Sequence, residues 1–325
     1  MEKQINYVGI DISKMTFDVA ISSGKGFSHH KFPNAEDGFE SLLSLLCIGD
    51  HCVMEASGPY YLRLATFLFE QDIAVSVVNP LVIRRFSQMR LFRSKTDKKD
   101  AQIIAQYGAV EQPARWSAED PHILELRQMQ AFLSQIEQVR TDIERQQQAF
   151  TLNTHPCPEV IEESEELKRN LLQKAARVEK RMHQIIKEHY QEQLAQLTSI
   201  PGIGIKTAIS LIIISAGFTK FQNAKQLSSY VGLCPRIFES GTSVKGRARI
   251  CKMGMGRIRK LLYLCALSAK KANRACREMF DRLVAKGKPK MLALIAVANK
   301  LLRQAFAVST KQKYYNENSN AFSCI

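Results

Sequence analysis

The sequence predicts an α/β domain over residues 1–115, then a long helical arm over 116–197, a mainly α domain over 198–310 and a polar tail over 311–325. Three observations predict this organisation. Strand-like and helix-like segments alternate up to about residue 115. Apolar residues then recur at intervals of three, four and seven, which is the spacing of amphipathic helices. Beyond residue 254 the apolar segments again have helical periodicity.

The first strands are predicted from two segments rich in strand-forming residues, 6–12 and 16–22, which we expect to pair antiparallel across a short turn. A third strand near 28–32 completes a meander. Helices and strands then alternate, with strands expected near 51–56 and 73–78 and helices near 36–46, 59–71, 80–89 and 98–109. This order is typical of a mixed sheet with helices on its faces.

Residues 121–197 predict two long amphipathic helices, interrupted at 153–158 by a segment that contains two prolines. Apolar positions include Leu126 and Ile136 in the first helix, and Leu171 and Met182 in the second. Such a pair can be an intramolecular helical hairpin or a coiled-coil arm for dimerisation, and the pattern mildly favours the coiled coil. Later helices are expected near 255–271, 273–286 and 289–307.

Four acidic residues lie where a polynucleotide-cutting α/β domain needs metal ligands. Asp11 interrupts an apolar strand and Glu55 ends another, although a buried carboxylate is unfavourable unless it is paired, protonated or bound to a cation. Asp97 and Asp100 share one face at the start of a predicted helix. Each acid alone is more often structural. Their combination predicts a site for a pair of Mg²⁺ ions that can activate a nucleophile on a phosphodiester.

The charge distribution predicts a polyanionic partner. The net charge is +15, and residues 236–290 carry sixteen Lys and Arg against three acidic residues. A second basic cluster leads into the Asp97 and Asp100 pair and consists of Arg84, Arg85, Arg90, Arg93, Lys95, Lys98 and Lys99. Phosphate contacts beside a metal site explain both clusters, although any single residue can instead belong to a solvated helix face.

Two segments of the C-terminal half are candidates for contact with DNA. Gly202 and Gly204 precede Lys206 in a turn typical of a helix-hairpin-helix element, whose free backbone N–H groups bind phosphate; plain inter-helix geometry is the alternative. Ser240 stands before a glycine in a basic, turn-rich stretch where a hydroxyl could approach a phosphodiester. No activating base is visible nearby, and a plain turn is the alternative. The basic residues of that stretch expected to bind nucleic acid are Arg236, Lys245, Arg247, Arg249 and Lys252.

The composition argues against several other classes of protein. The eight cysteines form no Cys-x-x-Cys pair and have no matching histidine spacing, so neither a zinc site nor a disulfide framework is predicted. We find no apolar run of transmembrane length and no signal-peptide pattern. These features predict an intracellular protein without a membrane partner.

Several separated motifs occur in a fixed order. They are Gly9-Ile10-Asp11, Met54-Glu55-Ala56-Ser57-Gly58, Lys95-Thr96-Asp97-Lys98-Lys99-Asp100-Ala101, Pro201-Gly202-Ile203-Gly204, and Gly232-Leu233-Cys234-Pro235-Arg236 through Ser240-Gly241 to Lys252-Met253-Gly254. Together they resemble the DEDD-type insertion-sequence transposases, a family that includes bridge-RNA-guided DNA recombinases and related pilin-gene invertases. The resemblance covers essentially the full length. Ser57 departs mildly from it, since Thr is common at that position.

The resemblance implies a RuvC-like N-terminal domain of ribonuclease H fold, in which the four acids hold Mg²⁺. It also implies a serine nucleophile, which falls on Ser240, with Ser243 close enough to be confused with it. The serine would attack the scissile phosphate to give a covalent phosphoserine, which a free DNA hydroxyl then displaces. Expected partners are donor and target DNA, a non-coding guide RNA, and further copies of the chain in a dimer or tetramer. The expected location is the bacterial cytoplasm, in association with the nucleoid.

Other readings of the same residues remain. A Mg²⁺-dependent junction-resolving nuclease would use the four acids with water as nucleophile. A site-specific invertase of the same family would select its sites through protein factors instead of RNA. An actin-like kinase or ATPase would need glycine-rich phosphate loops, which the sequence lacks. A DNA-binding protein without enzymatic activity would not need the four carboxylates.

Overall fold

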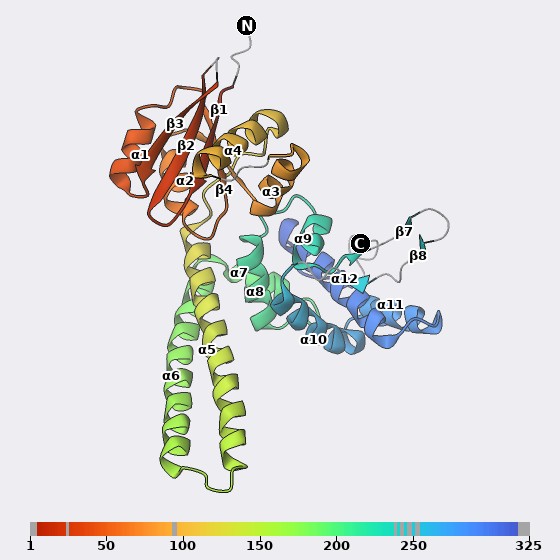
Figure 1. Cartoon of the computed structure of the whole chain (residues 1–325). Helices are drawn as coiled ribbons and strands as arrows, with labels where there is room; N and C mark the ends of the chain where they lie inside the picture. The colour runs from red at the N-terminus through yellow and green to blue at the C-terminus, as the bar shows by residue number, and fades with distance from the viewer. Residues whose placement is uncertain are drawn as a thin grey trace. The chain divides into compact units, whose positions relative to one another are not determined.

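The protein is described from a computed structural model that covers residues 5–23, 26–92, 96–236, 239–240, 244–245, 249–250 and 254–317. It divides into two compact units, residues 1–118 and 119–325, which are considered separately below (Figure 1). Residue 116, where the sequence predicts that the arm begins, packs with the first unit, because the Trp116 backbone N–H donates to Val75 O at 2.7 Å.

The first unit contains a five-stranded mixed sheet in the order β3-β2-β1-β4-β5. Strands β1 (Tyr7–Ile12), β2 (Thr16–Ser23) and β3 (Gly26–Pro33) form the predicted antiparallel meander, and β4 (His51–Glu55) and β5 (Ala74–Val78) extend it in parallel from β1. The helices are α1 (Glu36–Leu43), α2 (Tyr61–Glu70), α3 (Pro80–Met89) and α4 (Asp97–Glu111). Every strand and helix predicted before residue 115 is therefore present, with ends shifted by a few residues at most.

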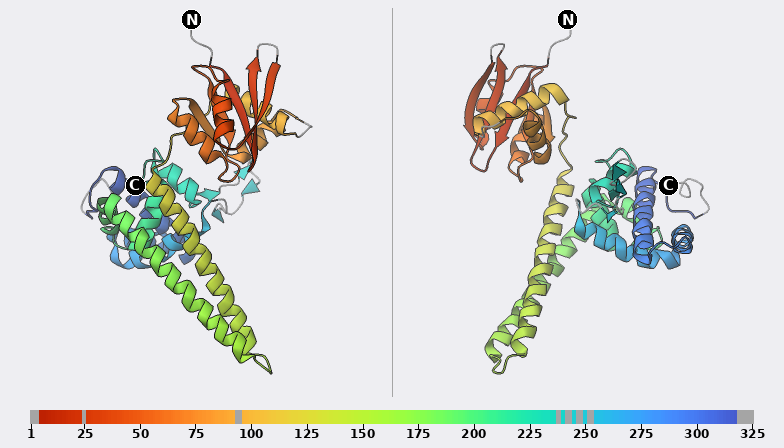
Figure 2. Two further views of the ribbon diagram at one scale, coloured as in Figure 1. Left: turned by 90° about the vertical axis from the view of Figure 1, so that its left-hand side faces the viewer. Right: turned by 45° about the vertical axis from the view of Figure 1, so that its right-hand side comes forward.

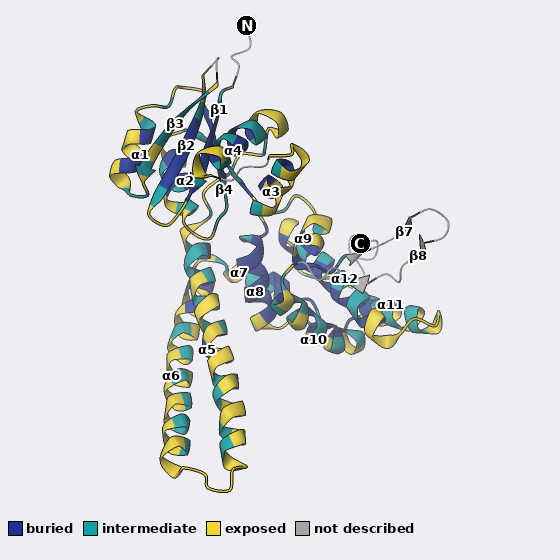
Figure 3. Cartoon of the chain, in the orientation of Figure 1, coloured by how far each residue is buried: buried dark blue, intermediate teal, exposed yellow. Residues whose placement is uncertain are grey.

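Each face of this sheet has its own apolar core, because successive side chains of a strand point to opposite faces. Val8, Ile10 and Phe17 belong to the core shared with α1 and α2. Tyr7 and Val53 belong to the core shared with α3 and α4. The dark blue interior of the sheet is visible in Figure 3.

In the second unit, two long helices, α5 (Pro121–Thr151) and α6 (Pro158–His189), lie side by side along their length (Figure 2). Both helices begin at a proline. Proline is favoured in the first turn because the N–H that it lacks would have no partner within the helix. Their shared apolar stripe is closed only at one end. Ile123, Leu126 and Met182 are buried there, whereas Leu167, another apolar position of the stripe, remains 49% exposed (Figure 3).

The rest of the second unit is mainly helical, as predicted. The helices expected after residue 254 are observed as α10 (Gly256–Ala272), α11 (Arg274–Ala285) and α12 (Lys290–Thr310). Three shorter helices precede them, α7 (Gln191–Thr198), α8 (Ile205–Ser215) and α9 (Ala224–Val231). Between α9 and α10, the described residues include the short strands β6 (Pro235–Arg236), β7 (Glu239–Ser240), β8 (Val244–Lys245) and β9 (Arg249–Ile250).

One expectation from composition needs correction. Among the described residues, α12 is long and apolar enough to cross a membrane by length and composition, with a mean hydropathy of 1.5. However, 56% of that window is buried within the protein. Val297, Leu301 and Ala305 are fully buried in the core shared with α8 and α10, so α12 has the packing of a core helix.

The six cysteines that the structure describes are free thiols. Cys52, Cys265 and Cys276 are buried, whereas Cys47 and Cys157 are exposed.

Candidate active site

The predicted metal ligands of the first unit lie on one face of the sheet. Tyr7, Gly9 and Asp11 alternate with the residues that face α1 and α2, so Asp11 points toward α4. Glu55 has the same orientation in β4 as Val53, which packs against α4. Since β1 and β4 are parallel neighbours, the two carboxylates stand at the carboxyl ends of adjacent strands. In α/β sheets this is a usual place for a ligand site.

Gly9 allows α4 to approach the sheet closely enough to bring its acids to this edge. A Cβ atom on Gly9 would lie 2.1 Å from Ala101 O and 2.3 Å from the Ala105 backbone nitrogen, far inside any permitted contact. The helix begins at Asp97, where the Thr96 hydroxyl caps it by accepting the Lys99 backbone N–H at 3.3 Å. Asp97 and Asp100 therefore occupy its first turn, where the helix dipole favours negative charge.

The other predicted ligands act electrostatically on Asp11. Burial and, in decreasing order, the negative charges of Asp100, Glu55, Asp97 and Asp18 together raise the pKa of Asp11 to about 6. Asp11, Glu55 and the Asp97–Asp100 pair lie far apart in the sequence, yet the charges of the other three acids all act on the Asp11 carboxylate. A bound cation would relieve this repulsion, and carboxylate oxygens are the ligands that Mg²⁺ and similar ions prefer. The set of donors therefore fits a divalent cation.

The carboxylates lie on the same side of the sheet but do not form a complete set of converging metal ligands. Within the described part of the chain, no three Asp, Glu, His or Cys side chains converge tightly enough to hold a metal ion together. One ligand is nevertheless held in place, because the Ser57 hydroxyl donates to Glu55 Oε1 at 2.8 Å. The serine that replaces the usual threonine thus keeps a hydrogen bond to the predicted ligand.

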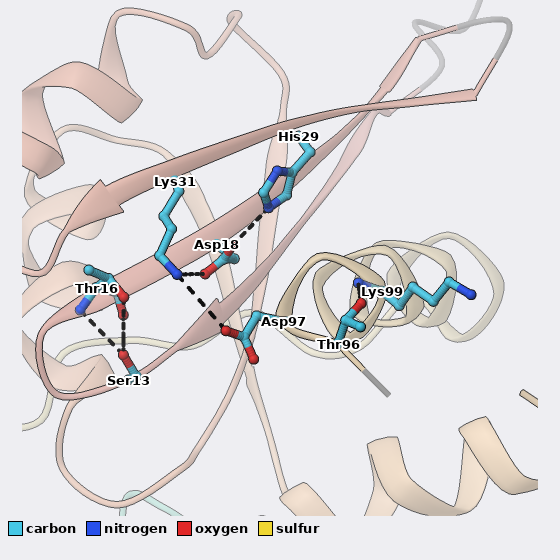
Figure 4. Close-up of polar contacts among 8 residues, drawn as sticks. All are labelled: Ser13, Thr16, Asp18, His29, Lys31, Thr96, Asp97 and Lys99. Atoms are coloured by element: carbon cyan, nitrogen blue, oxygen red, sulfur yellow. Dashed lines mark hydrogen bonds and ion pairs between the residues drawn. The ribbon is translucent and has the colours of Figure 1, made fainter. Parts of the chain in front are cut away.

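A fifth acid, Asp18, belongs to the same face and was missed from sequence. It pairs directly with Asp11 across β1 and β2, and with Lys31 across β2 and β3. Its carboxylate is buried, with Oδ1 at 2.7 Å from His29 Nε2 and Oδ2 at 3.4 Å from Lys31 Nζ. Figure 4 shows both contacts. Counting back from the turn at residues 13–15 pairs Asp11 with Asp18, so the strand register was the signal that could have revealed it.

Both ends of the segment that carries Ser240 are held by contacts within the second unit. Arg259 Nη1 donates to Val231 O at 3.0 Å, and Asn299 Nδ2 donates to Leu233 O at 3.3 Å. At the other end Gly254, with φ +118°, packs so closely that a Cβ would lie 2.8 Å from Val231 C. Between these ends β6 pairs with β9 and β7 with β8.

Ser240 itself lies in β7, where its backbone pairs with Val244. The predicted nucleic-acid contacts Arg236, Lys245 and Arg249 lie in β6, β8 and β9. Ser243, Arg247 and Lys252 lie outside the described residues.

The glycine turn joins α7 to α8, and its two glycines differ in their surroundings. Gly202 has φ +104°, and a Cβ there would lie 2.6 Å from Ala269 Cβ on α10. Gly204, the N-cap of α8, has no atom within 4 Å of such a Cβ. Gly202 is thus required by packing, whereas Gly204, Ile205 and Lys206 are exposed at a helix N-terminus.

The basic excess of residues 236–290 is divided between internal and exposed positions. Arg257 donates to the Gln130 carbonyl oxygen and the Ser134 hydroxyl on α5, so it fastens the arm to α10. Arg277, Lys286 and Lys288 are exposed on α11 and the turn that follows it. In the first unit, Arg84, Arg85 and Arg90 are exposed on α3 and at its end, and Lys98 and Lys99 on α4, whereas Arg93 and Lys95 fall outside the described residues.

Comparison with known proteins gives two family matches and similarity to three curated proteins. Residues 8–156 match the DEDD-type IS110 model described as "Transposase", and residues 194–281 match the model described as "Transposase IS116/IS110/IS902 family". The chain is 30% identical to a pilin gene-inverting protein of Moraxella lacunata, over 96% of this chain and 98% of that protein. A pilin gene-inverting protein of Moraxella bovis is 29% identical with the same coverage. An uncharacterized 43.6 kDa protein of insertion element IS110 from Streptomyces coelicolor is 33% identical over 38% of this chain and 31% of that protein.

Proposed function

The chain belongs to the DEDD-type IS110 family of transposases, and from this premise we propose that it cuts and rejoins DNA through a phosphoserine at a site where its four acids hold Mg²⁺. As a member of this family it is a DNA recombinase. The observation that carries the proposed site is the electrostatic convergence of Asp100, Glu55 and Asp97 on Asp11. A buried carboxylate with a purely structural role is usually paired with a cation or hydrogen-bond donors. The charges that shift the pKa of Asp11 are instead all negative.

The acids would hold the cation and so position the scissile phosphate. Asp11 and Glu55 would bind it from the sheet, and Asp97 and Asp100 from α4. When bound, Mg²⁺ would neutralise charge at the phosphoryl oxygens and so lower the barrier to nucleophilic attack at phosphorus. We propose that this unit has the ribonuclease H-like, RuvC-like fold, and the strand order and the acids at the ends of β1 and β4 support that assignment.

Ser240 would exchange one phosphodiester for another. Its Oγ forms a bond to phosphorus while the bond from phosphorus to one DNA oxygen breaks, and the departing DNA hydroxyl takes up the proton that the serine loses. Attack by a free DNA hydroxyl on the phosphoserine reverses the exchange and returns the proton to the serine. No external energy source is needed, since the number of phosphate ester bonds is conserved.

The second unit would supply the nucleic-acid surface. We propose that α7, the glycine turn and α8 form a helix-hairpin-helix element, in which the exposed N–H groups after Gly204 bind phosphate without reading sequence. Arg236, Lys245, Arg247, Arg249 and Lys252 would neutralise phosphates beside Ser240. The half-closed apolar stripe of α5 and α6 supports a coiled-coil arm that joins copies of the chain into a dimer or tetramer.

Two candidate functions differ in how the enzyme selects the DNA sites that it joins. A structured non-coding RNA could pair with donor and target DNA, as in the RNA-guided branch of the family. The two Moraxella relatives are named for inversion of a pilin gene, which favours site-specific inversion with protein factors as the second candidate. Sequencing of nucleic acid that co-purifies with the protein separates them, because only the first requires a defined RNA.

The decisive experiment looks for the covalent intermediate. The full chain is incubated with Mg²⁺, its flanking non-coding RNA and end-labelled donor DNA, and the products are separated under denaturing conditions. We expect a protein-DNA adduct with the wild type and with Ser243→Ala, and none with Ser240→Ala or Asp11→Asn.

The controls separate the possible failures. Asp11→Asn should retain DNA binding in a gel-shift assay, since the acids are not the main phosphate contacts. An adduct that is lost with Ser243→Ala instead would move the nucleophile by three residues. DNA cleaved without an adduct by both wild type and Ser240→Ala would replace the recombinase chemistry with that of a water-using junction-resolving nuclease.

A further inference from the structure

A row of charged side chains crosses three strands beside the proposed metal site. Asp11 on β1 is opposite Asp18 on β2, and Asp18 is opposite Lys31 on β3. Opposed residues of neighbouring strands point to the same face. All three therefore face α4, whose first turn carries Asp97.

Lys31 lies between an acid of the sheet and an acid of the helix. Its Nζ is 3.4 Å from Asp18 Oδ2 and 3.9 Å from Asp97 Oδ2 (Figure 4). The two ends of this bridge differ. Asp18 is buried and is also held by His29 at 2.7 Å, whereas the Asp97 side chain is 72% exposed. Asp18 is therefore a fixed anchor for the ammonium group, and Asp97 is the partner that can leave.

We propose that Lys31 is the built-in counter-cation of the acidic site: it pairs with Asp97 until a divalent cation takes its place, while Asp18 retains it. This proposal rests on the proposed function, because it takes Asp97 as a ligand. Lys31 acts through Asp97, because it competes with the cation for that carboxylate.

The competition has a definite sign. A unit positive charge beside one ligand must be displaced or repelled when a second cation binds, so removing it should tighten cation binding. The Lys31 side chain is 51% exposed, and water therefore screens much of the interaction. The cation must displace the Lys31–Asp97 ion pair, and the attraction of two unit charges about 4 Å apart in a largely aqueous environment corresponds to about a fivefold change in affinity. A lysine that merely supported the fold would weaken binding when removed.

The test is a calorimetric titration of the full chain with Mn²⁺ and with Mg²⁺, in the absence of nucleic acid. We expect Lys31→Met to bind both cations about fivefold more tightly than the wild type. Lys31→Arg, which keeps the charge, should bind them like the wild type. Lys174→Met is the matched control, because it removes one exposed lysine from α6 and changes the net charge equally. Thermal unfolding of each variant verifies that it is folded.

Asp97→Asn distinguishes failure of this inference from failure of the proposed function. If Asp97→Asn weakens cation binding but Lys31→Met leaves it unchanged or weakens it, the counter-cation role is wrong and the metal site stands. If neither substitution changes cation binding, the cation is held elsewhere and both proposals fall. An equal tightening in Lys174→Met would also overturn the local role, because net charge alone would then account for it.

Discussion

Ser57 illustrates how one small residue can set the orientation of a proposed metal ligand, Glu55. Its hydroxyl donates to Glu55 Oε1 at 2.8 Å, which leaves the other carboxylate oxygen available. We expect Ser57→Ala to weaken divalent cation binding by about tenfold, the lower end of the effect usual for partners that orient ligands. Titration with Mn²⁺ measures it. Ser57→Thr retains the hydroxyl and should restore wild-type affinity; equal losses in both variants would mean that packing, and not the hydrogen bond, matters at this position.

Gly9 makes a different kind of single-residue contribution, because the backbone of α4 occupies the space where a side chain would lie. Ala101 O would stand 2.1 Å from the added Cβ, and a helix backbone cannot rotate away as a side chain can. Gly9→Ala should therefore destabilise the protein by about 3 kcal/mol, at the upper end of overpacking effects. Denaturant unfolding measures the loss. Gly256→Ala, where the nearest atom is a flexible Arg259 nitrogen at 3.7 Å, should be nearly neutral.

At the scale of elements, the turn between α7 and α8 separates structural from functional requirements for glycine. Gly202→Ala adds a Cβ at φ +104° and 2.6 Å from Ala269 Cβ, and should destabilise the protein by about 2 to 3 kcal/mol. Gly204→Ala meets no atom and should cost less than about 1 kcal/mol as an N-cap change. Unfolding curves test both.

The same pair tests the proposed phosphate contact. Gly204→Ala should weaken DNA binding in a gel-shift assay, since a methyl group would obstruct close approach of a phosphate to the N–H groups of α8. Unaltered DNA affinity would assign the turn to inter-helix geometry alone.

The order of the elements could be predicted from sequence because local signals mark their ends. Asn79 caps α3 ahead of Pro80, and Thr96 caps α4, so strand and helix periods change at recognisable places. The acids Asp11 and Glu55 could be predicted as a site because a charge inside an apolar strand requires compensation. By contrast, the Asp18–Lys31–Asp97 contacts depend on strand register and on where α4 crosses the sheet. Neither is expressed in the local pattern around those residues.

At the scale of the whole molecule, the clustering of basic residues in one part of the chain predicts how the affinity for nucleic acid depends on salt concentration. Each phosphate contact releases condensed counterions, so replacing Arg247 and Arg249 by Gln should lower the slope of log K against log salt by about 1.8 on duplex DNA. Lys286→Gln with Lys288→Gln removes the same charge from the exposed turn after α11 and serves as the matched control. Equal reductions in slope in both double variants would indicate a diffuse basic field instead of contacts beside Ser240.

The two units have separate hydrophobic cores, and this predicts that the first can fold alone. The two clusters of the sheet unit draw only on residues between Tyr7 and Trp116, and the cluster of the other unit only on residues from Ile123 onward. Among the residues that the structure describes, no buried apolar side chain belongs to the clusters of both units. A fragment of residues 1–118 should therefore unfold cooperatively when monitored by circular dichroism. It should also bind Mn²⁺ with the affinity of the full chain, since the four acids lie within it. Asp97→Asn in the fragment should weaken that binding as it does in the full chain. A fragment that is folded but does not bind Mn²⁺ would show that the second unit contributes a ligand, and an unfolded fragment would show that the sheet depends on contacts beyond its own core.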